Sequence, residues 1–564
     1  MGRMKLSLAL AALLALAACD QGTDGAAEPP VTPVPPEGAA GPAAQAPAPE
    51  PPPDGLTILT ESGPLRGVIE NGVRTFRAIP YAAPPVGALR FSPPRRAASW
   101  EGVREAAEFG PICPQPRDVS VPEDEDCLTL NIWTPEGAEE GRRLPVLFWI
   151  HGGAFVSGSG RIDASAFARD GVVAVTINYR LGRLGVFAHP ELGPDGGGAG
   201  GINFGLLDQI AALKWVERNI EAFGGDPQRI TIAGVSAGAG YVNLLMSSPL
   251  AEGLFSGAIA QSGANGFAIS RRVSESFAGQ PSLEDLGVAF AESAGVSDAP
   301  DVAAALRALP WQAFVKNQPP GPYREASSPV VDGLEIPDDP GTVFSLGQQH
   351  MVPYIAGANS FEGSLSAAIP LPVFEEVVKA NPQEISQAYG VAADDPKLPL
   401  LLYGDYLFVA PTRYLVGLMA EQGAPAWSYF FGYVRESFES RLPGAFHGGE
   451  VPYVFDIIGD FQPNRMMQEV YGIEEGVYPP TARDLETARI MHAYWVNFVR
   501  TGDPNGEDLP AWPGYAEDAA TLVVLPEAIR VESNYRKAIL DRNEESFHEQ
   551  ATAARGEVEA EAEE

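Results

Sequence analysis

The sequence predicts an α/β fold in which a mostly parallel sheet carries helices on both of its faces. Short runs rich in β-branched and aromatic residues recur along the 564-residue chain. Stretches with apolar residues at helical spacing lie between these runs. Strands that alternate with helices indicate an open, mostly parallel sheet. In such sheets the chemistry lies at the carboxyl ends of the strands.

Strand-forming and helix-forming segments alternate along the chain. The sequence predicts strands at 144–150 and 172–178, a helix at 206–220, strands at 229–233 and 254–261, a helical segment at 270–309, strands at 353–357 and 426–433, and a helix at 486–500. The strands are short β-rich runs, such as Val-Val-Ala-Val-Thr-Ile-Asn at 172–178. The helices at 206–220 and 486–500 repeat their apolar residues at the spacing of one helix face. The segment 270–309 is expected to form part of a lid or cap.

The first 18 residues resemble an export signal. Arg3 and Lys5 give a positive start, and the apolar stretch 6–17 is short for a membrane-spanning helix. The stretch ends in Leu-Ala-Ala-Cys19, which resembles the bacterial lipobox. Cys19 is therefore expected to become the lipidated first residue of an exported protein, anchored to a bacterial membrane and facing the periplasm or the exterior. An ordinary signal peptide with an incidental cysteine is the alternative.

The rest of the chain divides by composition. Residues 19–54 are dominated by Ala, Pro, Gly and Glu, which cannot bury a core, so we expect an extended tether. Residues 55–548 are expected to form the globular domain. An acidic tail is expected at 549–564, and its end at 556–564, where Glu alternates with small residues, is expected to be solvated and mobile. Membrane contact is then expected through the lipid anchor only.

The charge balance argues against a nucleic-acid partner. Asp and Glu number 73 against 38 Lys and Arg, giving a formal charge of −35. Nucleic-acid phosphates require cationic surfaces, which this composition does not favour. The acidity serves solubility, or alternatively attracts cationic substrates.

The chain contains three cysteines. If Cys19 carries lipid, Cys113 and Cys127 remain as a pair in an oxidising compartment. A disulfide between them is expected, with two buried free thiols as the alternative.

One pentapeptide suggests nucleophilic catalysis. Gly234-Val235-Ser236-Ala237-Gly238 follows the β-rich run 229–233 and precedes a stretch that can begin a helix. A serine on a sharp strand-to-helix turn becomes a useful nucleophile when a base and backbone N–H groups lie beside it. The flanking glycines let such a turn close without Cβ clashes. Because 61 of the 564 residues are glycine, such a pentapeptide can occur by chance and is weak evidence for a catalytic serine by itself.

The serine requires a base, and the chain has six histidines. His492 lies in a predicted helix, His548 lies near the mobile tail, and His189 and His350 have no obvious partners. His151 and His447 precede glycine.

The two histidines that precede glycine suit different roles. His151-Gly152-Gly153-Ala154 directly follows a predicted strand, as expected for an oxyanion-hole loop, with a simple tight turn as the alternative. His447 lies in a glycine-flanked loop and could reach the serine as its base. A glycosidase-like or metal role for His447 and Glu450 is a further possibility.

The third member of the triad should be a carboxylate between the serine and the base in sequence, if the fold follows the order serine, acid, histidine. Glu362 fits because it comes just after the predicted strand at 353–357. Asp332 and Asp405 compete with Glu362 on spacing alone.

The chain resembles the type-B carboxylesterases, a family of α/β-hydrolases that includes the cholinesterases, over roughly 56–515. The matching motifs are Phe-Gly-Gly at 223–225 through Gly238, Glu-Asp-Cys-Leu-Thr-Leu-Asn-Ile-Trp at 125–133, Asn-Tyr-Arg-Leu-Gly at 178–182, Phe-Gly-Leu-Leu-Asp-Gln at 204–209, and Thr-Gly-Asp-Pro-Asn at 501–505. The resemblance implies an α/β-hydrolase fold with helical cap insertions and hydrolysis of a small-molecule carboxylic ester, without a metal or cofactor.

The resemblance also implies a role for each site residue. The nucleophile falls on Ser236, the acid on Glu362, the base on His447, the oxyanion donors on the N–H groups of Gly153, Ala154 and Ala237, and the early disulfide on Cys113 and Cys127. Two other classes of function stay open: the same triad acting on a lactone, thioester or activated amide, and a non-catalytic binding relative.

Two features depart from the family pattern. Val235 stands where the family often has glutamate, which removes a buried carboxylate near the base. The loop 114–126 carries no aromatic residue, so selectivity for choline esters is not expected.

Overall fold

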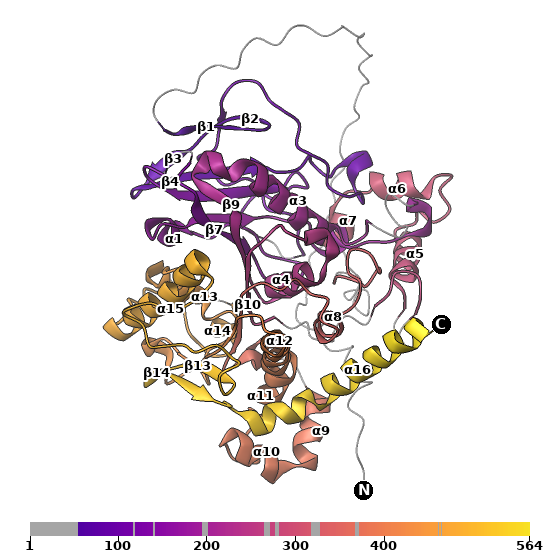
Figure 1. The fold of residues 1–564 in the computed structure, drawn as a ribbon. Helices are drawn as coiled ribbons and strands as arrows, with labels where there is room; N and C mark the ends of the chain where they lie inside the picture. The colour runs from indigo at the N-terminus through magenta and orange to yellow at the C-terminus, as the bar shows by residue number, and fades with distance from the viewer. Residues whose placement is uncertain are drawn as a thin grey trace, which may run out of the picture.

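The computed structural model describes residues 55–116, 119–138, 141–193, 201–263, 271–276, 281–316, 328–366, 371–460, 462–463 and 465–563. Within these residues, an eleven-stranded sheet runs through the molecule in the order β14-β13-β12-β11-β10-β9-β7-β8-β6-β4-β3 (Figure 1). The strands of this sheet are β3 Val68–Glu70, β4 Val73–Pro80, β6 Thr129–Pro135, β7 Leu144–Ile150, β8 Val173–Ile177, β9 Gly225–Val235, β10 Gly257–Gln261, β11 Tyr354–Asn359, β12 Ala426–Phe431, β13 Ala520–Leu525 and β14 Ala528–Ser533. A separate small sheet joins β1 Thr57–Thr60, β2 Gly63–Arg66 and β5 Arg104–Glu105.

The central strands of the large sheet are parallel and the strands at its edges are antiparallel. β8, β7, β9, β10, β11, β12 and β13 form one parallel block. The neighbours β6, β4 and β3 on one side, and β14 on the other, pair antiparallel. This arrangement confirms the predicted α/β fold class, and the six strands predicted from β-rich runs all lie in the parallel block.

Helices cover both faces because the strands carry apolar side chains on both sides. In β7, Val146, Phe148 and Ile150 belong to one core cluster, while Leu147 and Trp149 belong to the cluster on the opposite face. The first face packs against α3 Phe204–Asn219, α4 Ala237–Ser247 and α12 Ala410–Glu421. The second packs against α1 Ser165–Arg169 and α15 Ala482–Thr501. Strands buried on both faces have nearly continuous apolar sequences, and this is why the sequence could predict these strands.

The remaining helices surround this core. They are α2 Gly182–Gly185, α5 Leu283–Ser293, α6 Val302–Ala308, α7 Gln312–Val315, α8 Pro340–Ser345, α9 Pro372–Ala380, α10 Pro382–Tyr389, α11 Leu398–Gly404, α13 Val451–Val454, α14 Arg465–Glu469 and α16 Lys537–Glu563. The segment expected to be helical at 270–309 contains α5 and α6, which lie at one side of the molecule (Figure 1). Ser282 begins α5 with a capping box in which its side chain and that of Asp285 bond each other's backbone N–H.

The segment expected to be an acidic tail is helical. Helix α16 continues through 549–563 and extends across the molecule (Figure 1). Phe547 and Ala551 are buried, and Arg555 donates to the Ser345 carbonyl of α8. Glu and Ala are strong helix formers, and Phe547 and Ala551 are four residues apart on one helix face. The helix propensity of Glu and Ala, and the spacing of Phe547 and Ala551, explain why this acidic segment forms a helix.

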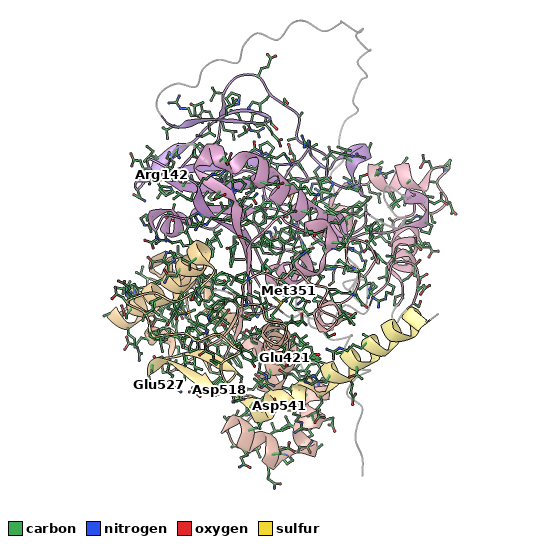
Figure 2. All side chains as sticks on the ribbon, viewed as in Figure 1. Arg142, Met351, Glu421, Asp518, Glu527 and Asp541 are labelled. Atoms are coloured by element: carbon green, nitrogen blue, oxygen red, sulfur yellow. A yellow bond between two sulfur atoms is a disulfide. The ribbon has the colours of Figure 1, made fainter. Side chains whose placement is uncertain are left out.

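The export signal at 1–18, the tether at 19–54 and the lipidation residue Cys19 lie outside the described residues. Among the helices that the structure describes, none is long and apolar enough to cross a membrane. Charged side chains cover the outside of the body, and the labelled acids Glu421, Asp518, Glu527 and Asp541 lie around α12, β13, β14 and α16 (Figure 2).

Candidate active site

Ser236 occupies a strained turn between β9 and α4. Its backbone has φ 57° and ψ −123°, which lies outside the common regions for a residue with a Cβ. The turn is held from both sides: the Ser236 N–H donates to the Gln261 carbonyl at the end of β10 (2.8 Å), and its carbonyl accepts from the Gly240 N–H (2.9 Å). Strain of this kind persists only where the surrounding structure enforces it.

The glycines around the turn are required by close backbone approaches. A Cβ on Gly238 would overlap the carbonyl oxygen of Ile150 at the end of β7. A Cβ on Gly152 would lie 2.7 Å from the Val235 carbonyl oxygen and 3.1 Å from the Ser236 Cβ. The loop after β7 and the serine turn after β9 therefore touch through glycine backbone, so no larger residue fits at either position.

Glu362 and His447 form a buried pair at neighbouring strand ends. The His447 Nδ1 hydrogen-bonds the Glu362 Oε2, and the Glu362 side chain has no exposed surface. The other oxygen, Oε1, accepts from the Ser262 hydroxyl and from the Asn359 N–H, both at 2.6 Å. The carboxylate therefore has three donors around it, and the imidazole is fixed in orientation.

The loop that carries His447 is held against the end of β11. The Phe361 N–H donates to the Ala445 carbonyl (2.9 Å), and the His447 N–H donates to the Ser364 hydroxyl (3.0 Å). The His447 ring also contacts Phe408, with ring centroids 4.7 Å apart. Its Nε2 is buried and has no hydrogen-bond partner among the described residues. The imidazole is thus anchored at Nδ1 while Nε2 stays available.

The competing acids have other partners. The Oδ1 of Asp332 accepts the N–H groups of 334, 335 and 336, which closes a turn. Asp405 accepts from the Tyr389 hydroxyl and pairs with Arg536, both at 2.5 Å. Of the three candidates, only Glu362 contacts His447.

A second buried carboxylate lies near the histidine. Glu450 is fully buried, and its oxygens accept from Gln261 Nε2 (3.0 Å) and Asn359 Nδ2 (2.5 Å). Burial raises the pKa of Glu450, and these two hydrogen bonds oppose that rise. Burial alone would lower the pKa of His447, but the Glu362 and Glu450 carboxylates outweigh it and the net pKa is raised. A carboxylate therefore remains near the base although position 235 is valine.

The sequence pattern did not identify Ser262, Asn359 or Gln261, and it considered Glu450 only for a metal or glycosidase role. These residues are single polar side chains at or just beyond the carboxyl ends of β10 and β11, or after the histidine. Their position at strand ends is the signal that could have found them. No group of three His, Cys, Asp or Glu that could hold a metal occurs in the described part of the chain.

Of the predicted oxyanion residues, Ala237 directly follows the serine, and Gly153 and Ala154 lie in the loop whose Gly152 touches the serine turn. Ala237 is the first residue of α4, and Gly153 and Ala154 have φ values of 123° and 54° in the loop after β7. His151, which opens this loop, stacks on Tyr179 with ring centroids 4.3 Å apart. Burial lowers the pKa of His151 to about 4, so the ring is neutral at neutral pH. His151 therefore packs the loop as a neutral ring.

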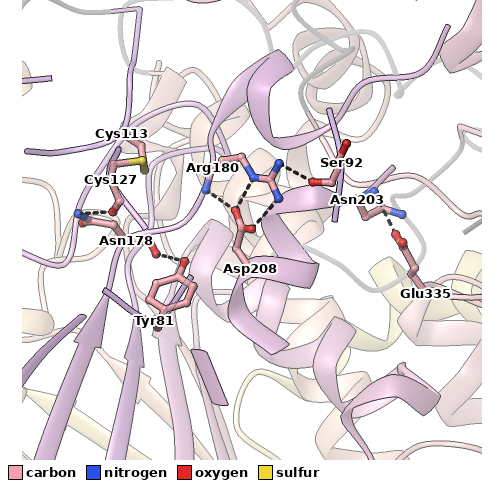
Figure 3. A network of polar contacts seen from close by, with 9 residues as sticks. All are labelled: Tyr81, Ser92, Cys113, Cys127, Asn178, Arg180, Asn203, Asp208 and Glu335. Carbon is pink, nitrogen blue, oxygen red and sulfur yellow. Dashed lines mark hydrogen bonds and ion pairs between the residues drawn. A yellow bond between two sulfur atoms is a disulfide. The ribbon is translucent and has the colours of Figure 1, made fainter. Parts of the chain in front are cut away.

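A polar network surrounds Arg180 and Asn178 near the Cys113–Cys127 disulfide (Figure 3). Arg180 donates to both oxygens of the buried Asp208, at 2.7 and 2.8 Å, and to the Ser92 carbonyl (2.8 Å). Asn178 accepts the Gly160 N–H at 2.9 Å. These contacts fix the segment after β8, whose Gly182 N–H in turn donates to the Phe155 carbonyl (2.8 Å).

The predicted disulfide is confirmed. Cys113 and Cys127 are bonded, and their Cα atoms lie 5.1 Å apart (Figure 3). The closed loop also reaches the oxyanion side of the site: Gln115 donates to the Gly158 carbonyl and accepts the Gly158 N–H, both at 3.0 Å.

The geometry thus combines a serine on a strained turn, an anchored imidazole with an available nitrogen, and a glycine loop against the serine. The sequence profile of the carboxylesterase family matches residues 54–392 and 397–541. The chain belongs to the carboxylesterase family. The predicted family and α/β-hydrolase fold are therefore confirmed.

Similar proteins agree with this assignment. The carboxylesterase is 36% identical over 485 residues to fumonisin B1 esterase of Sphingopyxis macrogoltabida, covering 82% of this chain and 84% of that one. It is 34% identical to phenmedipham hydrolase of Pseudarthrobacter oxydans, covering 84% and 95%. A solved PNB esterase superposes with a TM-score of 0.71 at 29% identity, covering 86% of this chain and 99% of the other. The carboxylesterase is an enzyme that hydrolyses carboxylic esters, as predicted, and the non-catalytic alternative is set aside.

Proposed function

We propose that this carboxylesterase cleaves small-molecule esters through an acyl-enzyme on Ser236, with His447 as the base and Glu362 as the acid of the triad. The single observation that carries the proposal is the buried Glu362–His447 pair, whose Nδ1 is held and whose Nε2 is free of other partners in the described residues. A base that is held in one tautomer at Nδ1 can accept a proton at Nε2.

The first half-reaction forms the acyl-enzyme. His447 Nε2 takes the proton of the Ser236 hydroxyl as Oγ attacks the ester carbonyl carbon. The carbonyl π electrons move to oxygen, and the N–H groups of Gly153, Ala154 and Ala237 stabilise the resulting oxyanion. When the tetrahedral intermediate collapses, His447 gives its proton to the leaving alkoxide and the alcohol departs.

The second half-reaction regenerates the serine. Water loses a proton to His447 and attacks the acyl carbon, and the Ser236 oxygen leaves and recovers that proton. The product is a carboxylic acid at the same oxidation level as the ester, so the cycle needs no oxidant. Glu362 orients His447 and stabilises the imidazolium that forms twice in each cycle.

The substrate is proposed to be an ester of a small alcohol or acid, because the relatives bear names of esterases and ester hydrolases. A lactone, a thioester or an activated amide would use the same steps, since each presents an acyl carbon with a leaving group. Comparison of matched oxygen esters, thioesters and anilides of one acyl group would rank these classes by kcat/KM.

The test uses the full chain and Ser236→Ala. We expect the wild type to hydrolyse p-nitrophenyl butyrate and the variant to lose about 10⁴-fold or more in kcat. An organophosphate should label one peptide, the one containing Ser236, as read by mass spectrometry. Ser297→Ala is a matched control, because it removes an exposed serine hydroxyl outside the site and leaves the nucleophile. Equal activity of wild type and Ser236→Ala would overturn the assignment.

We further propose that the enzyme is exported and anchored through lipid on Cys19. The lipobox-like sequence at 16–19 and a disulfide in the body both support an extracytoplasmic location. Labelling of the full chain with radioactive palmitate in a bacterial host, with Cys19→Ser as the control, is the test. Equal labelling of both chains would contradict the anchor.

A further inference from the structure

Asn359, the last residue of β11, contacts both the acid of the proposed triad and the segment that carries its base. Its backbone N–H donates to the Glu362 Oε1 at 2.6 Å. Its side-chain Nδ2 donates to the Phe446 carbonyl at 2.8 Å and to the Glu450 Oε2 at 2.5 Å. The residue is 1% exposed, so these bonds form away from water. One buried side chain therefore joins groups that lie on both sides of His447 in the sequence.

The base is carried on a four-residue turn, 446–449. The Phe446 carbonyl accepts the Gly449 N–H at 2.8 Å, and this bond closes the turn around His447. Glu450 directly follows the turn and begins α13. The bond within the turn fixes its shape, but it does not fix where the turn lies relative to Glu362.

The Asn359 amide holds the turn at both of its ends. An amide NH₂ group has two protons, and here one faces the carbonyl at the start of the turn and the other faces Glu450 just beyond its end. Glu450 is a firm attachment point because Gln261 donates to its other oxygen at 3.0 Å. Gln261 is held in turn by the indole N–H of Trp495, also at 3.0 Å. The turn is thus fixed to the ends of β10 and β11.

The chemistry of this position requires the amide of asparagine. Nδ2 faces two acceptors, so the flipped amide, with Oδ1 toward them, is excluded. An ionised aspartate has the same shape but no proton to donate, and a serine hydroxyl has only one. Two donors on one short side chain are what connect the turn to Glu450.

Other bonds hold the same loop without involving either carboxylate. The Ala445 N–H donates to the Ser360 Oγ at 2.9 Å, and the Phe361 N–H donates to the Ala445 carbonyl at 2.9 Å. These bonds fix the chain just before the turn. Ser360 therefore provides a comparison for Asn359, because it is the next residue in the chain and holds the same loop by one side-chain bond.

We propose that Asn359 is a positioning residue, which holds His447 against Glu362 through the two protons of its side-chain amide. The inference rests on the proposed function, because it takes Ser236, His447 and Glu362 as the triad. With the turn held at both ends, the His447 Nδ1 keeps its bond to Glu362 while its Nε2 accepts and returns the proton of Ser236.

The same amide acts on the charge near the base. The carboxylates of Glu362 and Glu450 both favour the protonated form of His447. The Asn359 amide lowers the pKa of Glu450 and so opposes the effect of burial. Two tyrosines also lie near these carboxylates, but burial raises the pKa of both hydroxyls and they stay neutral: Tyr403 and Tyr429. Loss of the amide therefore weakens the charge on Glu450 and lowers the pKa of His447.

The test is steady-state hydrolysis of p-nitrophenyl butyrate by variants of the full chain. Asn359→Ala removes the amide, and Asn359→Asp keeps its shape but replaces the donor by an acceptor. Ser360→Ala is the matched control, because it removes the side-chain bond to the Ala445 N–H and touches neither carboxylate. Urea midpoints show whether each variant is folded, and if Asn359→Ala does not fold, the isosteric Asn359→Asp decides.

We expect Asn359→Ala and Asn359→Asp each to lower kcat about 100-fold while KM changes less than about threefold, because the base moves and the substrate does not touch residue 359. Ser360→Ala should keep kcat within about threefold of wild type. The acid limb of the kcat/KM profile should move to lower pH in Asn359→Ala and stay in place in Ser360→Ala. A residue that only stabilised the fold would lower the urea midpoint and leave this limb unmoved.

A folded Asn359→Asp enzyme with kcat within about threefold of wild type would overturn the proposal. An unmoved acid limb in Asn359→Ala, or a loss of kcat in Ser360→Ala as large as in the Asn359 variants, would overturn it as well. Ser236→Ala separates this inference from the proposed function. If Ser236→Ala is inactive while both Asn359 variants are active, only the inference fails, whereas an active Ser236→Ala means that the proposed function fails.

Discussion

Replacing Glu362 by glutamine should abolish most activity by changing which nitrogen of His447 carries the proton. The Oε1 of Glu362 accepts two donors, the Ser262 hydroxyl and the Asn359 N–H, both at 2.6 Å. In the variant the amide oxygen should take this side. The opposite orientation would set an NH₂ group against the Asn359 N–H, a buried mismatch that costs on the order of 1–3 kcal/mol.

The amide NH₂ then faces His447 Nδ1. To accept that hydrogen bond, Nδ1 must lose its proton, and the neutral ring carries its proton on Nε2 instead. Nε2 can then no longer take the proton of Ser236. A triad acid changed to its amide in this way costs about 10⁴-fold in kcat, which corresponds to about 5.5 kcal/mol of transition-state stabilisation.

The assay is steady-state hydrolysis of p-nitrophenyl butyrate by the full chain. We expect kcat to fall about 10⁴-fold with KM changed little, because the substrate does not touch Glu362. Glu362→Asp is the control: it keeps the charge on a shorter side chain and should retain far more activity. A Glu362→Gln enzyme that stays folded and keeps kcat within about tenfold of wild type would refute the tautomer argument.

Three further predictions concern other buried groups. Glu450→Gln removes a carboxylate that favours the protonated form of His447, so the acid limb of the kcat/KM profile should move to lower pH; an unshifted profile would mean that Glu450 does not act on the base. Burial, with Asp332 nearby, raises the pKa of Glu335 from 4.5 to about 7. This shift corresponds to about 3 kcal/mol in the free energy of unfolding. Its contribution is complete below pH 4.5 and lost as the pH rises through about 7, so Glu335→Gln should flatten this loss in urea titrations, and an unchanged pH dependence would contradict it. The double variant Cys113→Ser, Cys127→Ser opens a loop with a sequence separation of 14 and should lower the free energy of unfolding by about 3 kcal/mol, seen as a lower urea midpoint.

The sequence predicted the sheet well because its strands are apolar on both faces. β7 matches the predicted bounds at 144–150, and β8 to β12 lie within a few residues of theirs, while β3, β4, β6, β13 and β14 had no predicted counterpart. The helix at the acidic end of the chain was not predicted, because its composition suggested solvation and the surface that buries Ala551 is supplied only by the fold. The positions of Phe547 and Ala551 on one helix face were visible, but the surface they pack against was not.

The site could be predicted only where a pattern or a resemblance existed. Ser236 has a local motif, but Glu362 and His447 lie 126 and 211 residues further along, so spacing alone left Asp332 and Asp405 as competitors. The structure distinguishes the three acids because Asp332 and Asp405 bond to other groups, whereas Glu362 bonds to His447. Ser262 and Glu450 had no local signal for their roles, since a single polar residue after a strand becomes meaningful only when a neighbouring strand end faces it.

The loop closed by Cys113 and Cys127 has a practical consequence for anyone who makes this enzyme. Gln115, inside that loop, bonds Gly158 twice, and Gly158 follows the segment that carries Gly153. Protein produced in a reducing cytoplasm would leave this support loose, so its measured turnover would understate that of the native enzyme. Any comparison of substrates should therefore use protein that was exported to an oxidising compartment or refolded under oxidising conditions.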